Sequence, residues 1–190
     1  INTAVTCITA YCCARYKYNL SRIVYVVVLV TMTIPIVGSL PSQIQVAQGL
    51  HIYNTIWGMW LQSASFLGLY FLVFYATFKG LSWTYAEAAQ IDGAGTLRCF
   101  VHVVMPVCQP ILGAAIALSF ADCWNLVEQP LTYLTTHTEL YPLSVAFNQL
   151  TQKSTGVEFA GAALYTLPAL FIYLFFQNDI LEGVQLTEPK

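Results

Sequence analysis

The stretch from residue 84 to residue 93 has the most informative spacing in the chain, and the chemistry that it suggests is protein contact rather than catalysis. It reads Thr-Tyr-Ala-Glu-Ala-Ala-Gln-Ile-Asp-Gly. Thr84 and Glu87 are spaced as a capping box, in which a hydroxyl and a carboxylate satisfy free N–H groups of the first helical turn. Ser82 is a second candidate for the N-cap. Gly93 stands where a left-handed glycine ends a helix, so the pattern predicts a short helix that begins near Thr84.

One face of this predicted helix is small and apolar. Tyr85, Ala88 and Ala89 share it, because residues three and four apart are neighbours on a helix. Two alanines allow another surface to approach closely, and the single aromatic ring projects beyond them. We therefore expect a contact surface for a partner. The alternative is a surface or re-entrant helix with a purely structural role.

No other residues in the sequence are spaced for catalysis or for metal binding. The histidines are scattered, and Gly93-Ala94-Gly95 lacks the lysine of a phosphate-binding loop. We therefore expect no metal site, no cofactor and no catalytic residue on this chain. The cysteines form no Cys-x-x-Cys pair, and we interpret them as small buried hydrophobic residues: Cys7, Cys12, Cys13, Cys99, Cys108 and Cys123.

The composition places the short helix in a membrane protein. The chain has 190 residues, of which 57% are hydrophobic and 8% are charged, whereas soluble domains carry about 25% charged residues. The mean hydropathy is +0.64. The net charge of −2, without a basic patch, excludes a nucleic-acid-binding function.

Long apolar runs predict the membrane helices, each of which needs roughly 20 apolar residues. Pro35 and Pro168 fall inside two runs, where a membrane helix tolerates proline. We predict an all-α, polytopic membrane helix bundle that forms one transmembrane domain over residues 1–190, with its N-terminus truncated. The predicted spans are roughly 1–14 (partial), 23–40, 55–78, 103–124 and 159–176.

The basic residues predict the orientation. The segments that connect successive spans lie alternately on the two sides of the membrane. Six of the seven Lys and Arg residues fall in the segments of one side, and only Lys153 falls in a segment of the other side. The positive-inside rule places the basic side in the cytoplasm, together with the loop 79–102. Cys99 in this loop is therefore expected to be accessible to reagents from the cytoplasm. The six residues are Arg15, Lys17, Arg22, Lys79, Arg98 and Lys190.

The loop resembles a known motif once the spacing to the next span is included. The EAA loop of bacterial binding-protein-dependent ABC importer permeases has the pattern EAA-x3-G-x9-I-x-L-P. This chain matches it with Glu87-Ala88-Ala89, Gly93 and Val103-Val104-Met105-Pro106, where Val103 and Met105 replace Ile and Leu. Further resemblance to the carbohydrate branch, and to its maltose-type second permease, lies in Ile91-Asp92-Gly93-Ala94, Trp124-Asn125 and Leu140-Tyr141-Pro142-Leu143.

The resemblance implies a MetI-like fold of the ABC type-1 importer kind and a permease that moves a sugar or oligosaccharide. It implies four kinds of partner: a homologous second permease, two cytoplasmic ATPase subunits that hydrolyse ATP, an extracytoplasmic solute-binding protein and the lipid bilayer. The setting would be a bacterial-type cytoplasmic membrane. The resemblance also implies that the short helix docks into the ATPase through coupling residues Tyr85, Glu87, Ala88, Ala89, Gly93 and Pro106.

Four polar residues are candidates for the translocation path. Asp122 is the one acid inside a predicted span, near its outer end, and Asn125 follows it. Gln62 and Ser65 could line the path or could equally bond neighbouring helices.

Other functions stay open at this point. An importer permease for a peptide, an amino acid or phosphate is the nearest alternative. A secondary transporter or channel without an ATPase would show several buried charges or broken helices at the bilayer centre. A membrane-embedded enzyme would need His, Asp or Glu clusters within the spans.

Overall fold

Helices form all the regular secondary structure in the part of the chain that the computed structural model describes. That part is residues 1–16, 18–34, 38–65, 67–82, 84–150 and 155–187. The expectation of an all-α fold is therefore confirmed for these residues.

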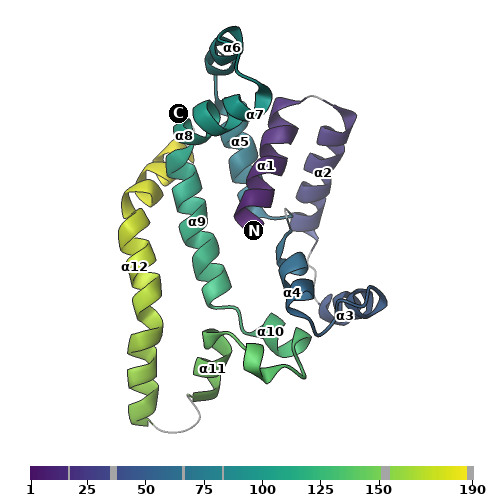
Figure 1. The fold of residues 1–190 in the computed structure, drawn as a ribbon, viewed down its shortest axis with the longest axis vertical. Coiled ribbons are helices and arrows are strands. Elements are labelled where there is room, and N and C mark those ends of the chain that lie inside the picture. The colour runs from purple at the N-terminus through teal and green to yellow at the C-terminus, as the bar shows by residue number, and fades with distance from the viewer. Residues whose placement is uncertain (17, 35–37, 66, 83, 151–154, 188–190) are drawn as a thin grey trace.

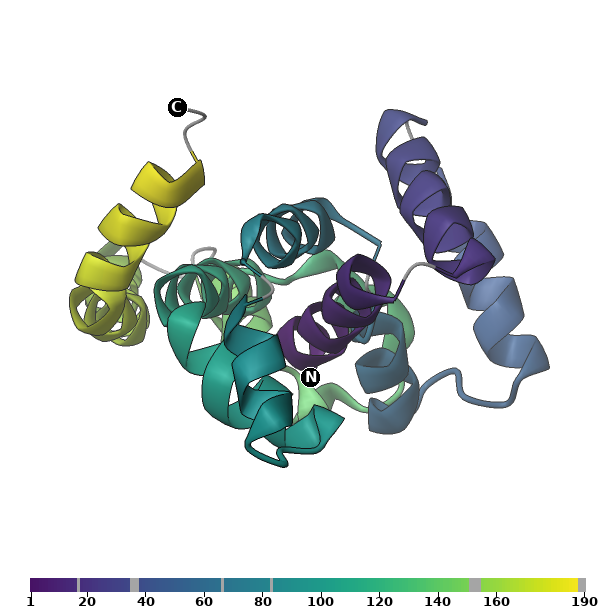
Figure 2. The same ribbon diagram turned by 90° about the horizontal axis from the view of Figure 1, so that it is seen from above.

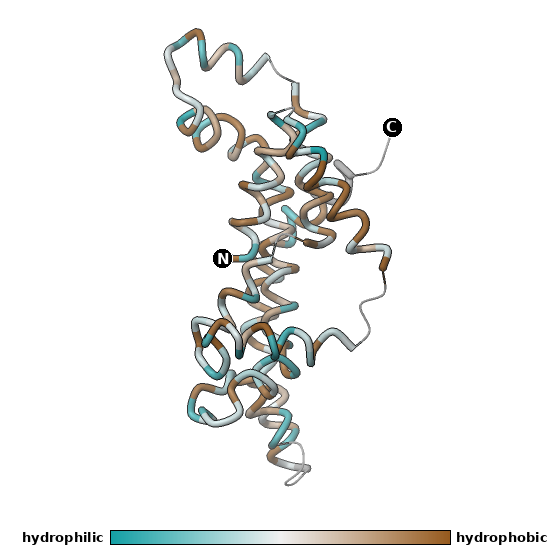
Figure 3. Tube along the Cα trace, turned by 90° about the vertical axis from the view of Figure 1, so that its right-hand side faces the viewer, coloured by the Kyte–Doolittle hydropathy of each residue, from teal (hydrophilic) through white to brown (hydrophobic). Residues whose placement is uncertain are grey.

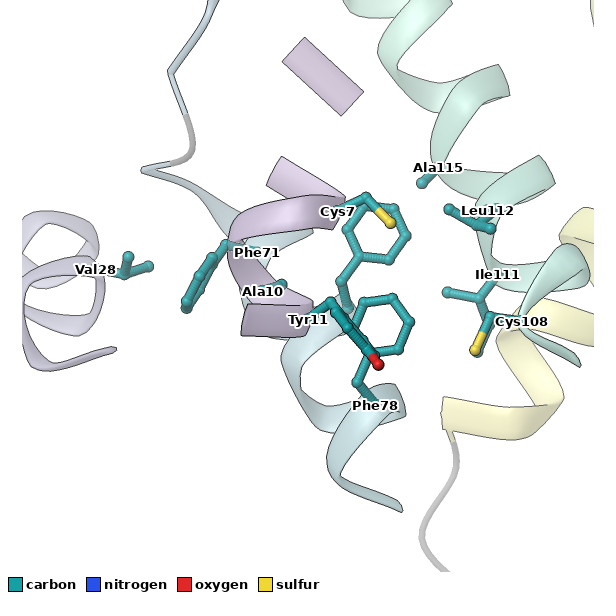
Figure 4. Close-up of a cluster of buried hydrophobic side chains, with 11 residues drawn as sticks. Cys7, Ala10, Tyr11, Val28, Phe71, Phe78, Cys108, Ile111, Leu112 and Ala115 are labelled. Atoms are coloured by element: carbon teal, nitrogen blue, oxygen red, sulfur yellow. The ribbon is translucent and has the colours of Figure 1, made fainter. Parts of the chain in front are cut away.

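Three helices form the centre of the molecule: α1 (Asn2–Arg15), α5 (Leu69–Gly80) and α9 (Gln109–Trp124). Their facing sides are apolar and aromatic, and Figure 4 shows the side chains converging between them. The ring of Tyr11 lies 5.5 Å from that of Phe78 and 4.4 Å from that of Phe100, measured between centroids. Cys7 and Cys108 are buried in the same core, and Cys99 is buried as well, as the sequence predicted. The prediction was wrong for Cys12 and Cys123, which are exposed, and Cys13 is only partly buried.

Two further helices flank this centre, as Figures 1 and 2 show: α2 (Asn19–Thr33) on one side and α12 (Thr155–Thr187) on the other. Their apolar side chains are largely exposed, including Phe171 at 65% and Phe175 at 80%. Such surfaces are stable in lipid or against other protein, not in water. Figure 3 shows that hydrophobic residues recur along the length of the bundle.

Among the described residues, one helix is both long and apolar enough to cross a membrane alone, Gly156–Leu181 within α12. It contains the predicted span 159–176. A bent pair, Thr96–Val107 with α9, passes the same test together, and α2 and α5 are apolar but shorter. Passage of the other segments through the membrane stays a prediction.

The range 55–78 is divided between two helices instead of forming one. α4 (Ile56–Ser63) ends at Ala64, and α5 begins after Gly68. The hydroxyl of Ser65 accepts a hydrogen bond from the N–H of Leu67 at 3.2 Å. A serine that binds its own backbone in this way competes with the helix, which the apolar run alone does not reveal.

The range 23–40 also contains a shorter helix than we expected, because α2 ends at Thr33. Ile34 is extended, with φ −84° and ψ 118°, as is usual for the residue before a proline. Residues 35–37, including Pro35, lie outside the described residues. α3 (Leu40–Gly49) then begins as a separate helix after Gly38, whose φ is +78°.

The range 103–124 bends sharply near its start. α7 (Thr96–Cys99), the π-helix η1 (Phe100–Val104) and α8 (Met105–Val107) follow one another, and this segment meets α9 at 81°. Pro106 and Pro110 stand four residues apart on either side of Cys108. Each removes the N–H that would bond four residues back, so the helix widens before the bend and restarts after it.

The remaining helices gather at the two ends of the bundle (Figure 1). α6 (Thr84–Ile91) lies at one end, near the C-terminal ends of α1 and α5, which carry Arg15 and Lys79. The opposite end holds α3, α4, α10 (Glu128–Tyr133), the 3-10 turn η2 (Thr138–Leu140) and α11 (Leu143–Leu150).

Candidate functional site

The two ends of α6 are fixed by local hydrogen bonds. At its start, the Oγ of Ser82 accepts a bond from the Thr84 N–H at 3.5 Å and lies 2.8 Å from the Thr84 hydroxyl. Ser82, the second candidate, therefore contacts the start of the helix. At its end, Gly93 has a φ of +82°, which confirms the left-handed conformation expected there.

The C-terminal bonds of α6 form a Schellman motif around Gly93. Its N–H donates to the carbonyl of Gln90 at 3.0 Å, and the next N–H, of Ala94, donates to the carbonyl of Ala89 at 2.9 Å. These two bonds satisfy carbonyls that a helix end otherwise leaves free. The direction in which the chain leaves α6 is thereby fixed by the backbone itself.

α6 rests on the bundle through one side and leaves the other side open. Ala86 is 5% exposed, and Ala89 is half-buried. Tyr85 and Ala88 are exposed, and so is Ile91, at 87%. The expected contact face is thus open at two of its three residues.

We call the exposed side chains of Tyr85, Ala88 and Ile91 the α6 surface. Our interpretation of the sequence missed Ile91 as part of this surface and Ala86 as the residue that anchors the helix. The signal was available, because Ile91 follows Ala88 by three residues and Ala86 lies on the opposite side.

The segment between α6 and α9 is helical over most of its length. Gly95 precedes α7, and Pro106 is the exposed middle residue of α8.

Cys99 is only 2% exposed. The expectation that reagents reach Cys99 was wrong, because its side chain packs inward from α7.

A polar hollow lies at the opposite end of the bundle, between α3, α4 and α10, with a volume of about 570 Å³. The side-chain amide of Gln62 donates to the Oε1 of Gln43 at 2.5 Å. Gln62 Oε1 is itself buried and has no hydrogen-bond partner among the described residues. Burial raises the pKa of the Tyr133 hydroxyl, which also lines this hollow, further above neutrality. The polar lining is Ser39, Ser42, Gln43, Gln62, Ser65, Gln129 and Tyr133.

The four predicted path residues are therefore not brought together. Gln62 and Ser65 line the polar hollow. Asp122 instead accepts a hydrogen bond of 2.7 Å from the hydroxyl of Tyr70, which ties α9 to α5. Asn125 accepts one of 3.1 Å from the hydroxyl of Tyr165 on α12.

The sequence did not indicate Gln43 and Gln129 as lining residues. Gln43 lies in α3 and Gln129 in α10, far apart in the chain, and only the tertiary fold brings them to Gln62. Within the described residues, no three His, Cys, Asp or Glu side chains are placed to hold a metal ion.

Comparisons with known proteins agree with this geometry. The family model for the binding-protein-dependent transport system inner membrane component matches residues 4–180. The diacetylchitobiose uptake permease NgcG of Streptomyces coelicolor is 29% identical, over 92% of this chain and 60% of its own length. The arabinooligosaccharide permease AraQ of Bacillus subtilis is 26% identical, over 95% of this chain and 64% of its own.

A solved structure shares the fold. It is a bacterial ABC transporter that imports the acidic polysaccharide alginate, and it superposes with a TM-score of 0.74 at 21% identity, over 93% of this chain and 70% of that one. This chain thus spans about two thirds or less of the two relatives named above. With the family model covering nearly all of its residues, the chain belongs to the family of binding-protein-dependent transport system inner membrane components.

Proposed function

We propose that this chain is the non-catalytic permease subunit of an ATP-driven importer that moves a sugar or oligosaccharide across the cytoplasmic membrane. The observation that carries the proposal is the α6 surface. It is apolar, it lies on the exposed side of a helix whose end is fixed by backbone hydrogen bonds, and it lies at the end of the bundle that carries Arg15 and Lys79. An exposed apolar patch on a fixed support is typical of a protein-protein contact.

The partner of the α6 surface is a cytoplasmic ATPase subunit. Ala88 lets a groove approach the helix backbone, while Tyr85 and Ile91 provide larger side chains on either side of it. Such apolar anchors supply most of the affinity of an interface. A homologous second permease, two ATPases and an extracytoplasmic binding protein complete the transporter. Hydrolysis of ATP is assigned to the ATPases, because nothing in this chain's sequence resembles a nucleotide site.

Motion passes from α6 to the membrane through the segment that follows it. The Schellman motif at Gly93 fixes the exit of the chain, and the helical turns from Thr96 to Val107 lead to α9 at a fixed bend of 81°. A displacement of α6 by the ATPase would therefore tilt α9. The bond between Asp122 and Tyr70 would carry that tilt to α5.

The polar hollow supports a sugar as the cargo. Its lining supplies amides and hydroxyls, which match the hydroxyl groups of a sugar. Several relatives are named for diacetylchitobiose, arabinooligosaccharides and trehalose. One relative, from Yersinia enterocolitica, is named for sn-glycerol-3-phosphate. The described lining of the hollow contains no Lys, Arg or His, so a neutral sugar fits it better than a phosphate ester.

Reconstitution tests this function. The complete transporter, with its ATPases and its binding protein in proteoliposomes, should take up a labelled oligosaccharide only when ATP is present on the ATPase side. Omission of the binding protein should abolish uptake. Uptake that is driven by an ion gradient without ATP would contradict the proposal and favour a secondary transporter.

A further inference from the structure

A second hollow, of about 630 Å³, opens between α1, α2 and α5 at the same end of the bundle as α6. It lies where the chain passes from α1 into α2 and where α5 ends. The basic residues of this end place the hollow at the cytoplasmic boundary of the membrane. It has no part in the docking of α6 or in the polar hollow at the other end.

Two cations line this hollow, Arg22 on α2 and Lys79 on α5. Both are exposed, and neither forms an ion pair with a carboxylate among the described residues. The described lining contains no acidic residue. The charges of Arg22 and Lys79 therefore have no counter-ion within the part of the chain that the structure describes, and they favour an anion from outside the chain.

Tyrosines frame the two cations. The Lys79 ammonium lies 5.6 Å from the ring centre of Tyr75, and the Tyr75 and Tyr25 rings lie 4.7 Å apart. The first turn of α2 faces the same hollow, with the side chains of Asn19 and Ser21 in its lining. The N–H of Ser21 already donates to the carbonyl of Tyr18 at 3.1 Å. The start of α2 therefore contributes the partial positive charge of a helix end and not a free donor at Ser21, and this charge adds to the attraction of the two cations.

The face of α2 that carries Arg22 becomes apolar beyond the hollow. It continues with Val26 and Leu29, which are 49% and 37% exposed. A ligand that has an anionic head and long hydrocarbon chains would match both parts: its head would lie between Arg22 and Lys79, and its chains would follow α2 into the bilayer.

We propose that this hollow binds the headgroup of an anionic phospholipid of the cytoplasmic leaflet. The phosphate lies between the two cations, with the tyrosine rings at the level of the headgroups, where aromatic side chains are most stable. Basic pockets between membrane helices on the cytoplasmic side recognise anionic lipids through this combination of charge and position. The lipid thereby fills the gap between α2 and the rest of the bundle.

Lipid retention tests the site directly. The complete transporter is placed in nanodiscs of phosphatidylcholine with a minor fraction of phosphatidylglycerol, released into mild detergent, and analysed by native mass spectrometry for bound lipid. The wild type should retain phosphatidylglycerol in preference to phosphatidylcholine. Arg22→Gln and Lys79→Gln should each lower this preference about fivefold, and the double variant about 30-fold.

Control variants separate this site from a general charge effect. Arg98→Gln removes an exposed cation outside the hollow and should leave retention unchanged, and Lys79→Arg should keep most of it. Excess inorganic phosphate should not displace the lipid. Equal retention by the double variant and the wild type would overturn the proposal. Displacement by free phosphate would equally overturn it and indicate a site for a soluble anion.

Discussion

At the end of the molecule that carries α6, backbone geometry fixes the exit of a single helix that exposes one of its sides, whereas at the opposite end residues from three helices line a polar hollow. Gly93 and Gly58 illustrate the difference between the two ends. Gly93 has a φ of +82° and nothing within 4 Å of an added Cβ, while an added Cβ at Gly58 would lie 2.0 Å from the carbonyl oxygen of Ile52. One glycine is required by its conformation and the other by its neighbours, so their substitutions should fail in different ways.

The largest loss of stability is expected at Gly58. Gly58→Ala places a methyl group against the backbone of Ile52, which cannot move without disturbing the wall of the polar hollow. Overpacking of this kind costs about 1–3 kcal/mol. The purified transporter should unfold at a lower temperature, as measured by a thermal shift assay in detergent.

Gly49→Ala is the matched control for that experiment, because nothing lies within 4 Å of the added Cβ and its φ is not positive. Its melting temperature should equal that of the wild type. If Gly58→Ala and Gly49→Ala lowered the melting temperature equally, the contact of the added methyl group with Ile52 would not be the cause.

The largest loss of transport without a loss of fold is expected at Gly93. Gly93→Val forces a β-branched residue into the left-handed conformation, at a cost of about 1–2 kcal/mol. The chain would leave α6 in a different direction, so the α6 surface would miss its partner. Protein levels should stay near normal, uptake should be abolished, and the ATPase should co-purify less.

Gly93→Asn provides the contrast, because asparagine adopts the left-handed conformation more readily than other residues. Its uptake should lie well above that of Gly93→Val. Normal uptake by the Gly93→Val variant at a normal expression level would contradict a role for this turn in coupling α6 to the membrane helices.

A smaller and more specific effect is expected in the polar hollow. Gln62→Leu removes an amide that donates to Gln43 and whose own oxygen is buried and accepts no hydrogen bond from the described residues. If this amide binds a sugar hydroxyl, the apparent KM for uptake should rise about tenfold, the usual worth of one such hydrogen bond. Asn125→Leu is the control, because it removes the hydrogen bond from the hydroxyl of Tyr165 on α12. It should lower the stability and the maximal rate of uptake but leave the KM nearly unchanged.

The smallest effect is expected in the loop between α10 and α11. A hydrogen bond of 2.8 Å from His137 lowers the pKa of Glu139 below its usual value. The contact is therefore present at neutral pH and is lost as the pH falls through that lowered pKa. His137→Ala should return the pKa of Glu139 toward its ordinary value in an NMR titration, with no change in uptake, since the pair is exposed. An unchanged pKa would show that the histidine is not the cause.

The same contrast separates what the sequence could predict from what it could not. The helix at 84–91 and its end at Gly93 were predictable because the signals are local: a capping residue, a run of alanines and a glycine. The two helices within 55–78 and the shortened helix within 23–40 were not predicted, because apolar runs do not indicate where side chains interrupt a helix. The bend at Cys108 did have a signal, the spacing of Pro106 and Pro110.

The polar hollow illustrates the opposite limit. Gln43, Gln62 and Gln129 belong to three separate helices, and no spacing in the chain relates them. Asp122 was a reasonable candidate for the path as the lone acid of its span, yet its carboxylate bonds to Tyr70 of a neighbouring helix. Sequence patterns identify polar residues in a membrane segment, but tertiary contacts decide whether they face a cavity or another helix.

The most direct test of the account is site-specific cross-linking of the α6 surface in the assembled transporter. Ala88→Cys, in a background without other cysteines, should form a cross-link to the ATPase subunit when it is labelled with a maleimide-benzophenone reagent and irradiated, in a yield that changes when ATP is added. Gln90→Cys, on the same helix but outside the α6 surface, should cross-link far less. Efficient cross-linking at Gln90 but not at Ala88, or none at either in an actively transporting complex, would contradict the assignment of α6 as the helix that docks into the ATPase.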